Sequence, residues 1–434
     1  MSDLYTDSYA DVYGESPGVG TPVYGDTYSD TYFDTYGQVG FGGVDTPTPG
    51  GGTVPGVIGG FPVPAPAQWR LFLHRPRSAE PYADVAATSR TVVLNLGEPS
   101  TCAFGLSGRD PNVDQVEEFI ADVVWRRNGV AMLRCRVGAS DDSIDVDTHR
   151  VNFSGVDYRS LLDRRYLSTT ISTTGSPTGR EQNEIVWDMV AQTQAQPNGN
   201  LGITKSQTWV SSGVSRKDVW EAGTAIGQAI TDIGQRRSVD GLYGFDWDVM
   251  PDLQLRLFAP VRGTATGWSL EYGVNVSSVT RRLSSSDYSN RVVTQWRDRA
   301  GIERMAIAQS VDLPTRPEGL WESWQGGSWA TTGEGLAQAQ GMLAKSQGIL
   351  PSYEVELMPG TWDPQFCWLG DTIPLTVQSG RLEVRGVPYR VQSIKIDIDD
   401  DGKESVSVTL GNPVFKLSTQ LWLYGRSIST LERR

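Results

Sequence analysis

The 434-residue sequence has few cysteines and no long apolar run. Its three cysteines, Cys102, Cys135 and Cys367, are scattered, which argues against a disulfide framework and against a zinc knuckle. No apolar stretch approaches the roughly 20 residues that a membrane helix needs. The N-terminus lacks the basic and apolar regions of a secretory signal. The sequence therefore predicts a protein without a membrane span, made in a reducing cytoplasm.

Residues typical of catalytic sites are also scarce. The only histidines are His74 and His149, so a Ser–His or Cys–His pair would have to use one of them. The metalloprotease, phosphate-loop and cysteine-nucleophile signatures are missing. A carboxylate pair that cleaves glycosides stays open, because 51 acidic residues make some pairing inevitable. We predict that the chain is not an enzyme and has no catalytic, cofactor-binding or metal-binding residues.

Positive charge is missing from the first part of the chain. No lysine or arginine precedes Arg70, whereas eight acidic residues do, and these supply eight of the 13 net negative charges. The rest of the chain keeps a net charge of −5, without a cluster of basic residues that would bind a phosphate backbone. Stable nucleic-acid binding is therefore not predicted.

Residues 1–67 form an arm of low complexity in which tyrosine recurs at every fourth position. The arm is rich in Gly and Pro and poor in aliphatic residues, so it cannot fold alone. The repeated tyrosines are Tyr5, Tyr9, Tyr13, Tyr24, Tyr28, Tyr32 and Tyr36. Either the arm is a solvated disordered tail, or its tyrosines dock on a neighbouring protein, since tyrosine is an efficient interface anchor.

From residue 68 onward, short alternating runs predict an α+β fold that is dominated by β-strands. Asn128-Gly129 is a strong hairpin signal, because both residues tolerate the positive φ of a two-residue turn. We expect two small antiparallel barrel modules with an inserted helical region. The predicted divisions are 68–155 for the first barrel, 156–300 for the inserted helical and mixed region with returning strands, 301–349 for a Trp-rich loop and helix, 350–412 for the second barrel, and 413–434 for a C-terminal docking segment.

The segment 151–167, VNFSGVDYRSLLDRRYL, changes from strand to helix spacing. Ser154 followed by Asp157 fits the N-cap of a helix that begins there. Two further helices are expected, at 181–195 and at 215–235. The second of them is expected to begin with a capping pair formed by Ser215 and Asp218.

Two motifs near the C-terminal half could carry chemistry. A loop with Trp321, Trp324 and Trp329 could stack sugars, although such rings more often pack against the protein itself. Residues 397–402, DIDDDG, match the start of a calcium loop. Position twelve of that loop is Val408, however, where a bidentate glutamate belongs. Alternating flanks favour a β-hairpin turn with solvated acidic residues.

Two strings of residues resemble the tail-hub, or minor tail, proteins of long-tailed actinobacterial siphophages, a family related to the central baseplate hub of contractile-tailed phages. The first string is formed by Phe153, Gly155, Asp157, Leu161, Leu162 and Arg165, followed by Leu201, Gly202 and Ile203. The second is formed by Leu369, Gly370 and Asp371, then Tyr389, Arg390 and Val391, then Val408, Thr409, Leu410 and Gly411. In this order, the resemblance spans about 68–415 and leaves out the arm.

The resemblance implies a structural protein at the distal tip of the phage tail. Three copies would close and extend the tail tube and organise the peripheral proteins for DNA ejection. The implied partners are the distal tail protein ring, the tape-measure protein and other minor tail or receptor-binding proteins, with DNA only in transit. The alternative is a tail-tip protein that binds or cleaves host cell-wall polysaccharide through the tryptophan loop. In either case, the protein would be made in the host cytoplasm and carried in the virion.

Overall fold

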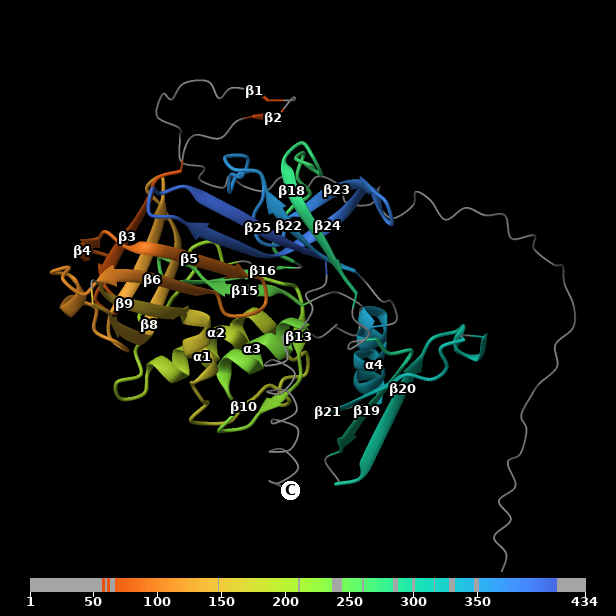
Figure 1. The fold of residues 1–434 in the computed structure, drawn as a ribbon. Coiled ribbons are helices and arrows are strands. Elements are labelled where there is room, and N and C mark those ends of the chain that lie inside the picture. Colours follow the sequence, from red (N-terminus) through yellow and green to blue (C-terminus); the bar gives the residue numbers. More distant parts are fainter. Residues whose placement is uncertain are drawn as a thin grey trace, which may run out of the picture. The chain divides into compact units, whose positions relative to one another are not determined.

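The computed structural model confirms a β-rich α+β fold, with 46% of residues in strands and 15% in helices (Figure 1). The structure describes residues 57–58, 61–62, 67–146, 148–209, 211–235, 244–259, 261–283, 288–298, 301–315, 317–327, 332–346 and 351–411. These all belong to one compact unit that begins at Pro55. The arm tyrosines, Trp329 and the segment 413–434 lie outside the described residues. Within the described part, no helix is long and apolar enough to cross a membrane.

A 13-stranded sheet holds both β-modules. The first module supplies β3 (Trp69–His74), β4 (Pro81–Val85), β5 (Thr88–Asn95), β6 (Thr101–Ser107), β7 (Asp122–Arg127), β8 (Val130–Ile144) and β9 (His149–Asp157). The second supplies β17 (Leu270–Glu271), β18 (Val276–Arg282), β22 (Ser352–Leu357), β23 (Thr372–Ser379), β24 (Leu382–Ile398) and β25 (Glu404–Gly411). The main path runs β18-β22-β25-β24-β5-β6-β9-β8-β7-β3-β4, with β23 beside β24 and β17 beside β23.

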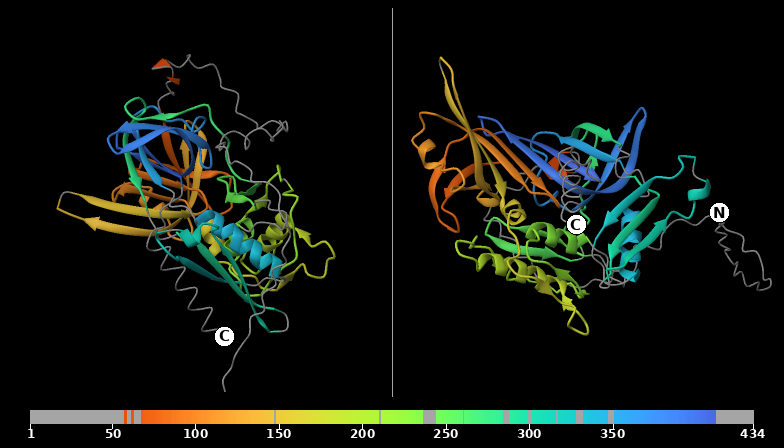
Figure 2. Two further views of the ribbon diagram at one scale, coloured as in Figure 1. Left: turned by 90° about the vertical axis from the view of Figure 1, so that its right-hand side faces the viewer. Right: turned by 90° about the horizontal axis from the view of Figure 1, so that it is seen from below.

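The two modules are joined by antiparallel pairing of β24 with β5, from Ser393 opposite Asn95 to Ile398 opposite Arg90. One hydrophobic core runs across this joint, with Val92 and Ile396 both fully buried. Figures 1 and 2 show the blue strands of the second module continuing the orange strands of the first. The two modules are therefore parts of one continuous sheet.

The hairpin predicted at Asn128-Gly129 is confirmed. Asn128 has φ +49° and Gly129 has φ +83°, as a two-residue turn between β7 and β8 requires. Trp125 and Met132, on either side of the turn, are buried in the core. The local turn chemistry and the apolar flanks agree, which explains why this hairpin could be recognised from sequence.

The inserted region has its own core, formed around three helices and small sheets. Its elements are α1 (Tyr158–Asp163), β10 (Ile171–Ser172), β11 (Arg180–Glu181), α2 (Gln182–Gln194), β12 (Thr204–Lys205), β13 (Ser215–Arg216), β14 (Val219–Trp220), α3 (Ile226–Gln235), β15 (Asp246–Val249) and β16 (Gln254–Phe258). Helix α3 contacts both α1 and α2 (Figures 1 and 2). Helix α2 confirms the helix predicted at 181–195, including its buried face of Ile185, Val186, Met189 and Val190.

The helix predicted at 215–235 is wrong in its first half. Ser215 lies in β13 opposite Glu181, and the carbonyl of Asp218 accepts from the amide of Thr173, next to the short strand pair β10·β14. Gly223 then adopts φ +84°, and the helix begins only at Ile226. The short strand pairs satisfy backbone groups that a longer helix would otherwise have satisfied.

A smaller three-stranded sheet follows the inserted region. Its strands are β19 (Arg291–Arg297), β20 (Glu303–Gln309) and β21 (Glu322–Gly326), in the order β20-β19-β21, and α4 (Thr332–Ser346) follows them. The other described elements are not part of this sheet. They are the separate strand pair β1 (Val57–Ile58) and β2 (Phe61–Pro62) and the single helical turns Val113–Gln115 and Leu313–Thr315. Helix α4 packs on β19 and β20 through Val292, Ala308 and Ala339.

The predicted tryptophan loop is corrected by this sheet. Trp324 lies within β21, opposite Val293, and it is 59% exposed. Trp321 precedes the strand and meets the ring of Tyr288 edge-on at 5.8 Å. Residue pairing places Trp324 in line with Val293 and Ile307, on the face away from α4. The expectation that these rings cover a packed corner does not hold for Trp324.

Candidate functional site: the junction of the two signature strings

The first signature string begins inside the large sheet. Phe153 is buried and stacks on Phe104 at 5.2 Å. Gly155 is needed for close approach, because an added Cβ would lie 2.9 Å from the carbonyl oxygen of Arg136. The later residues of the string lie in the inserted region. Leu162 is buried in the core of that region and Leu161 packs against the same core. The carbonyl of Arg165 accepts from the amide of Ile226. The string thus connects the two cores.

Asp157, rather than Ser154, caps the helix. Strand β9 continues to Asp157, whose carboxylate accepts from the amides of Ser160 at 3.2 Å and Ser100 at 2.7 Å. Ser154 instead lies within the strand, opposite Ala103. Because β9 is paired on both sides, by β6 and by β8, the strand extends past the local capping signal. The predicted N-cap at Ser154 is therefore wrong.

Arg159 is the functional residue of this corner that sequence reasoning missed. Its guanidinium donates to the carbonyls of Trp247 at 2.8 Å and Gly97 at 2.7 Å. The same group lies 4.1 Å from the centre of the Trp247 ring, a cation–π distance. Because most arginines are exposed, an arginine in a short basic helix is expected to face solvent, and the local sequence does not indicate that this one is buried.

The second signature string forms a tight turn against the inserted region. Gly370 has φ +87°, and an added Cβ would lie 2.4 Å from the carbonyl oxygen of Arg262. The carboxylate of Asp371 accepts from the amides of Thr264 at 3.0 Å and Trp368 at 2.8 Å. Glycine and aspartate are thus required by backbone conformation and by two otherwise unpaired amides. Leu369 beside them is buried in the large core.

Both strings converge on β15. Arg159, which lies between residues of the first string, donates to the backbone carbonyl of Trp247, and Arg390 of the second string forms an ion pair with Asp246. Arg390 also donates to the carbonyl of Arg262 at 3.0 Å. Arg262 in turn donates to the carboxylate of Asp248 at 2.8 Å. Strand β15 of the inserted region is therefore bound to the second β-module through Arg390, and Arg159 of α1 links it to the carbonyl of Gly97 in the first β-module.

A cavity of about 20 Å³ lies at this junction, which is room for one water molecule. Its polar lining includes Ser100, Arg134, Asp157, Asp248 and Arg262. Burial, and to a smaller extent the nearby Asp248 carboxylate, raise the pKa of Asp157 to about 7, although the amides of Ser100 and Ser160 oppose the shift. Arg262 and Asp248 in this lining are hydrogen-bonded to each other, as described above, so the cavity lies within the contacts that join the modules.

A second joint lies inside the large sheet. Arg127 on β7 makes a bidentate contact with Glu404 on β25, at 3.0 and 2.7 Å, and donates to the carbonyl of Trp362 at 3.2 Å. The indole of Trp69 donates to the same Glu404 carboxylate at 2.9 Å. These side chains are buried. They hold the first and second modules together independently of the β24·β5 pairing.

The hairpin predicted at 397–402 is confirmed. The amide of Gly402 donates to the carbonyl of Asp399, and Gly402 has φ +82°. The acidic residues are not merely solvated: Asp397 accepts from the hydroxyl of Thr91 at 2.7 Å, and Asp400 accepts from the amide of Ser89 at 3.2 Å. Within the described residues, no cluster of three or more His, Cys, Asp or Glu could hold a metal ion.

The three cysteines are free thiols, and all are buried. Burial raises the pKa of the Cys135 and Cys367 thiols, so the reactive thiolate is disfavoured at both positions. The two histidines have different surroundings. His74 is buried in β3, whereas His149 is the first residue of β9 and lies beside Asp142. Neither set of residues is arranged around a nucleophile.

No protein-family model and no curated protein matches the sequence. Solved structures do match its fold. The 43 kDa tail protein of prophage MuSo2 from Shewanella oneidensis aligns with a TM-score of 0.57 and 13% identity, over 80% of this chain and 99% of that one. A tail protein from Neisseria meningitidis MC58 gives 0.53 and 11%, over 79% and 96%. The prophage tail protein gp18 from Listeria monocytogenes gives 0.50 and 11%, over 83% and 99%. The chain shares the fold of these tail proteins.

Proposed function

We propose that this chain is a structural protein of a phage tail, and that three copies form the hub of the tail tip. The shared fold, which spans nearly the whole length of the prophage tail proteins, carries this proposal. The two β-modules of each chain lie in one continuous sheet. Three such chains could present six modules to a sixfold tail tube, closing a ring of fixed size.

The proposed partners follow from this position. The hub would contact the distal tail protein ring and the tape-measure protein, and it would carry other minor tail or receptor-binding proteins. The tyrosine arm would be one docking element. DNA would pass through the ring only in transit, and a body with a net charge of −5 would bind its phosphates poorly. A non-enzymatic role agrees with a junction built from structural contacts.

The position and copy number of the chain in the particle test this proposal. Cryo-electron microscopy of virions labelled at this protein should show three copies on the tail axis, with two β-modules per chain beside the tube. Copies attached to the side of the tail, away from the axis, would contradict the hub assignment.

Trp324 favours a second candidate function, the binding of host cell-wall polysaccharide. Its ring is 59% exposed on a sheet face, where a sugar ring could stack on it. Under this candidate, the full-length chain should be retained on purified host cell walls, and Trp324→Ala should abolish most of that retention. Trp321→Ala is the matched control. Equal retention of Trp324→Ala and the wild type would exclude the tryptophan platform.

A further inference from the structure

The two β-modules repeat the same succession of strands. In the first, β7, β8 and β9 are consecutive antiparallel neighbours, and in the second β23, β24 and β25 are. The middle strand is the long one in both cases, with 15 residues in β8 and 17 in β24. Each middle strand also has an irregularity against the third strand, at Val137/Ala139 and at Val391/Ser393. These shared irregularities align the modules residue by residue.

The alignment extends through the neighbouring strands. Starting just after each irregularity, the residues that lie opposite one another are Ala139, Ser154, Ala103 and Thr91 in the first module, and Ser393, Thr409, Glu354 and Thr280 in the second. Strand β8 therefore corresponds to β24, and β5 corresponds to β18. Within this alignment, Thr280 occupies the position of Thr91.

The far end of β24 pairs with β5, but its counterpart in the first module has a free edge. The pairing of β8 with β7 stops at Arg136, and residues 139–144 have β9 alone as a neighbour within the described part of the chain. These residues are exposed, with Ile144 at 76%. The amber hairpin of β8 and β9 extends beyond the adjoining strands in both views of Figure 2. A two-stranded ribbon without further support is only marginally stable in water.

Among the described strands, β18 supplies the complementary free edge. It is the last strand of the sheet and pairs with β22 alone along the main path. Its counterpart β5 is paired on both sides, by β6 and by β24. Each chain thus has one open β8 end and one open β18 edge, which are the two halves of a second joint like β24·β5.

We propose that residues 139–144 of one copy pair, antiparallel, with β18 of the next copy. The joint within the chain fixes the register, because Asp397 lies opposite Thr91. The register expected between copies places Asp141 opposite Arg282, Asp142 opposite Arg281, Ser143 opposite Thr280, and Ile144 opposite Val279. Two acidic residues thus meet two basic residues, and two apolar residues meet each other. Cross-strand pairs of these kinds stabilise antiparallel sheets.

The charges also select which edges can meet. Pairing β8 with β8 of another copy would set Asp141 and Asp142 against carboxylates, and pairing β18 with β18 would set Arg281 and Arg282 against guanidinium groups. Like charges placed directly opposite each other are destabilising. The favoured contact is therefore head-to-tail, and a head-to-tail contact that closes gives a ring. This inference rests on the ring in the proposed function and identifies its contact surface.

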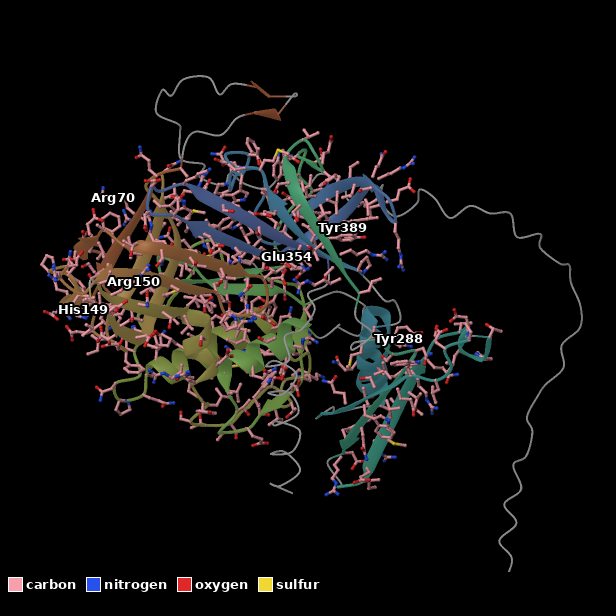
Figure 3. All side chains as sticks on the ribbon, viewed as in Figure 1. Arg70, His149, Arg150, Tyr288, Glu354 and Tyr389 are labelled. Carbon is pink, nitrogen blue, oxygen red and sulfur yellow. The ribbon has the colours of Figure 1, made fainter. Side chains whose placement is uncertain are left out.

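Within the described part of the chain, Asp142 and Arg282 contact exposed local partners. Asp142 lies 3.6 Å from the imidazole of His149, and Arg282 forms an ion pair with Glu354 at 2.5 Å. Figure 3 labels His149 and Glu354. Exposed ion pairs contribute little to stability, so they can be exchanged for contacts across the joint. Charged residues on a free edge also keep it from pairing with unrelated strands before assembly.

Charge reversal tests the proposed surface. Asp141→Arg with Asp142→Arg should weaken self-association of the full-length chain about ten- to a hundredfold, as measured by analytical ultracentrifugation. Arg281→Asp with Arg282→Asp should do the same. The four substitutions in one chain should restore association, because every opposed pair again has opposite signs. Glu383→Arg with Arg385→Glu, an exposed pair on another hairpin, is the matched control and should leave association unchanged.

Cysteine cross-linking tests the register. Asp142→Cys with Arg281→Cys should form disulfides between copies under mild oxidation, because opposed residues lie within about 4.5–5.5 Å between Cα atoms. Asp142→Cys with Arg282→Cys should not, because adjacent residues point to opposite faces of the strand. The three native cysteines are buried and should not interfere. Cross-linking of both pairs, or of neither, would contradict the proposed register.

The outcomes separate this inference from the proposed function. An assembled ring that survives both charge reversals would overturn the contact surface and leave the hub assignment intact. A wild-type chain that stays monomeric, together with a cysteine pair that does not cross-link, would overturn both. Unchanged circular dichroism and melting temperature of the isolated variants would show that their chains are folded.

Discussion

Replacing Arg127 by methionine should lower the free energy of unfolding by about 3–5 kcal/mol, the usual cost of removing one partner from a buried ion pair. Methionine fills much of the same space but leaves the Glu404 carboxylate without a cation. That carboxylate is only 8% exposed, so water cannot compensate for the loss. Denaturant unfolding of the full-length chain, followed by tryptophan fluorescence, measures the change.

Two controls show whether the buried charge is responsible. Adding Glu404→Gln to Arg127→Met should recover most of the stability, because glutamine carries no charge and still accepts from the Trp69 indole. Arg297→Met breaks the exposed Arg297–Glu303 pair and should cost less than about 1 kcal/mol. Equal losses for Arg127→Met and for the double variant would mean that packing, not charge, sets the cost.

The parts of the fold that could be predicted from sequence are those with a local physical signal. The turn at Asn128-Gly129 needs positive φ at two consecutive residues, and that requirement is visible in the sequence itself. The buried face of α2 repeats with the helical period, as shown by Ile185 and Met189. In both cases, neighbouring residues determine the structure that they adopt.

The errors arose where distant pairing decides the structure. Ser154 and Ser215 both resemble helix caps, but each lies in a strand whose partner is far away in the sequence, Ala103 and Glu181 respectively. Pairing with these partner strands satisfies the backbone groups, so the local preference for a helix cap is overruled. Strand pairing over long sequence separations leaves no local pattern from which it could be read.

The candidate site shows the same division. Asp157, Gly370 and Asp371 could be selected by resemblance, and the structure shows what each contributes to the junction. Arg159 could not be selected, because its partners Trp247 and Gly97 are carbonyls of distant segments. Backbone carbonyls are present at every residue, so their use as hydrogen-bond acceptors leaves no compositional signature.

The stability of the chain should depend on pH through Asp157. Its pKa in the folded chain is about 7, whereas an unfolded aspartate titrates near about 3.9. Between these values the folded chain holds a proton that the unfolded chain has released, so stability falls as pH rises from about 4 to about 7. Three pKa units correspond to about 4 kcal/mol. Urea titrations across this range should show that loss, and Asp157→Asn should remove this part of the pH dependence.

Asp248→Asn identifies the cause of the shift. Burial, the larger cause, is unchanged by this substitution, but the neighbouring negative charge is removed. The pKa of Asp157 should therefore fall while remaining above its ordinary value, and the pH at which the stability loss ends should move below about 7. Asp84→Asn, at an exposed ion pair on β4, should leave the profile in place. If the free energy of unfolding depended on pH in the same way for the wild type and for Asp157→Asn, the group that titrates in this range would not be Asp157. The expected difference arises because the folded wild-type chain holds a proton on Asp157 that asparagine cannot hold.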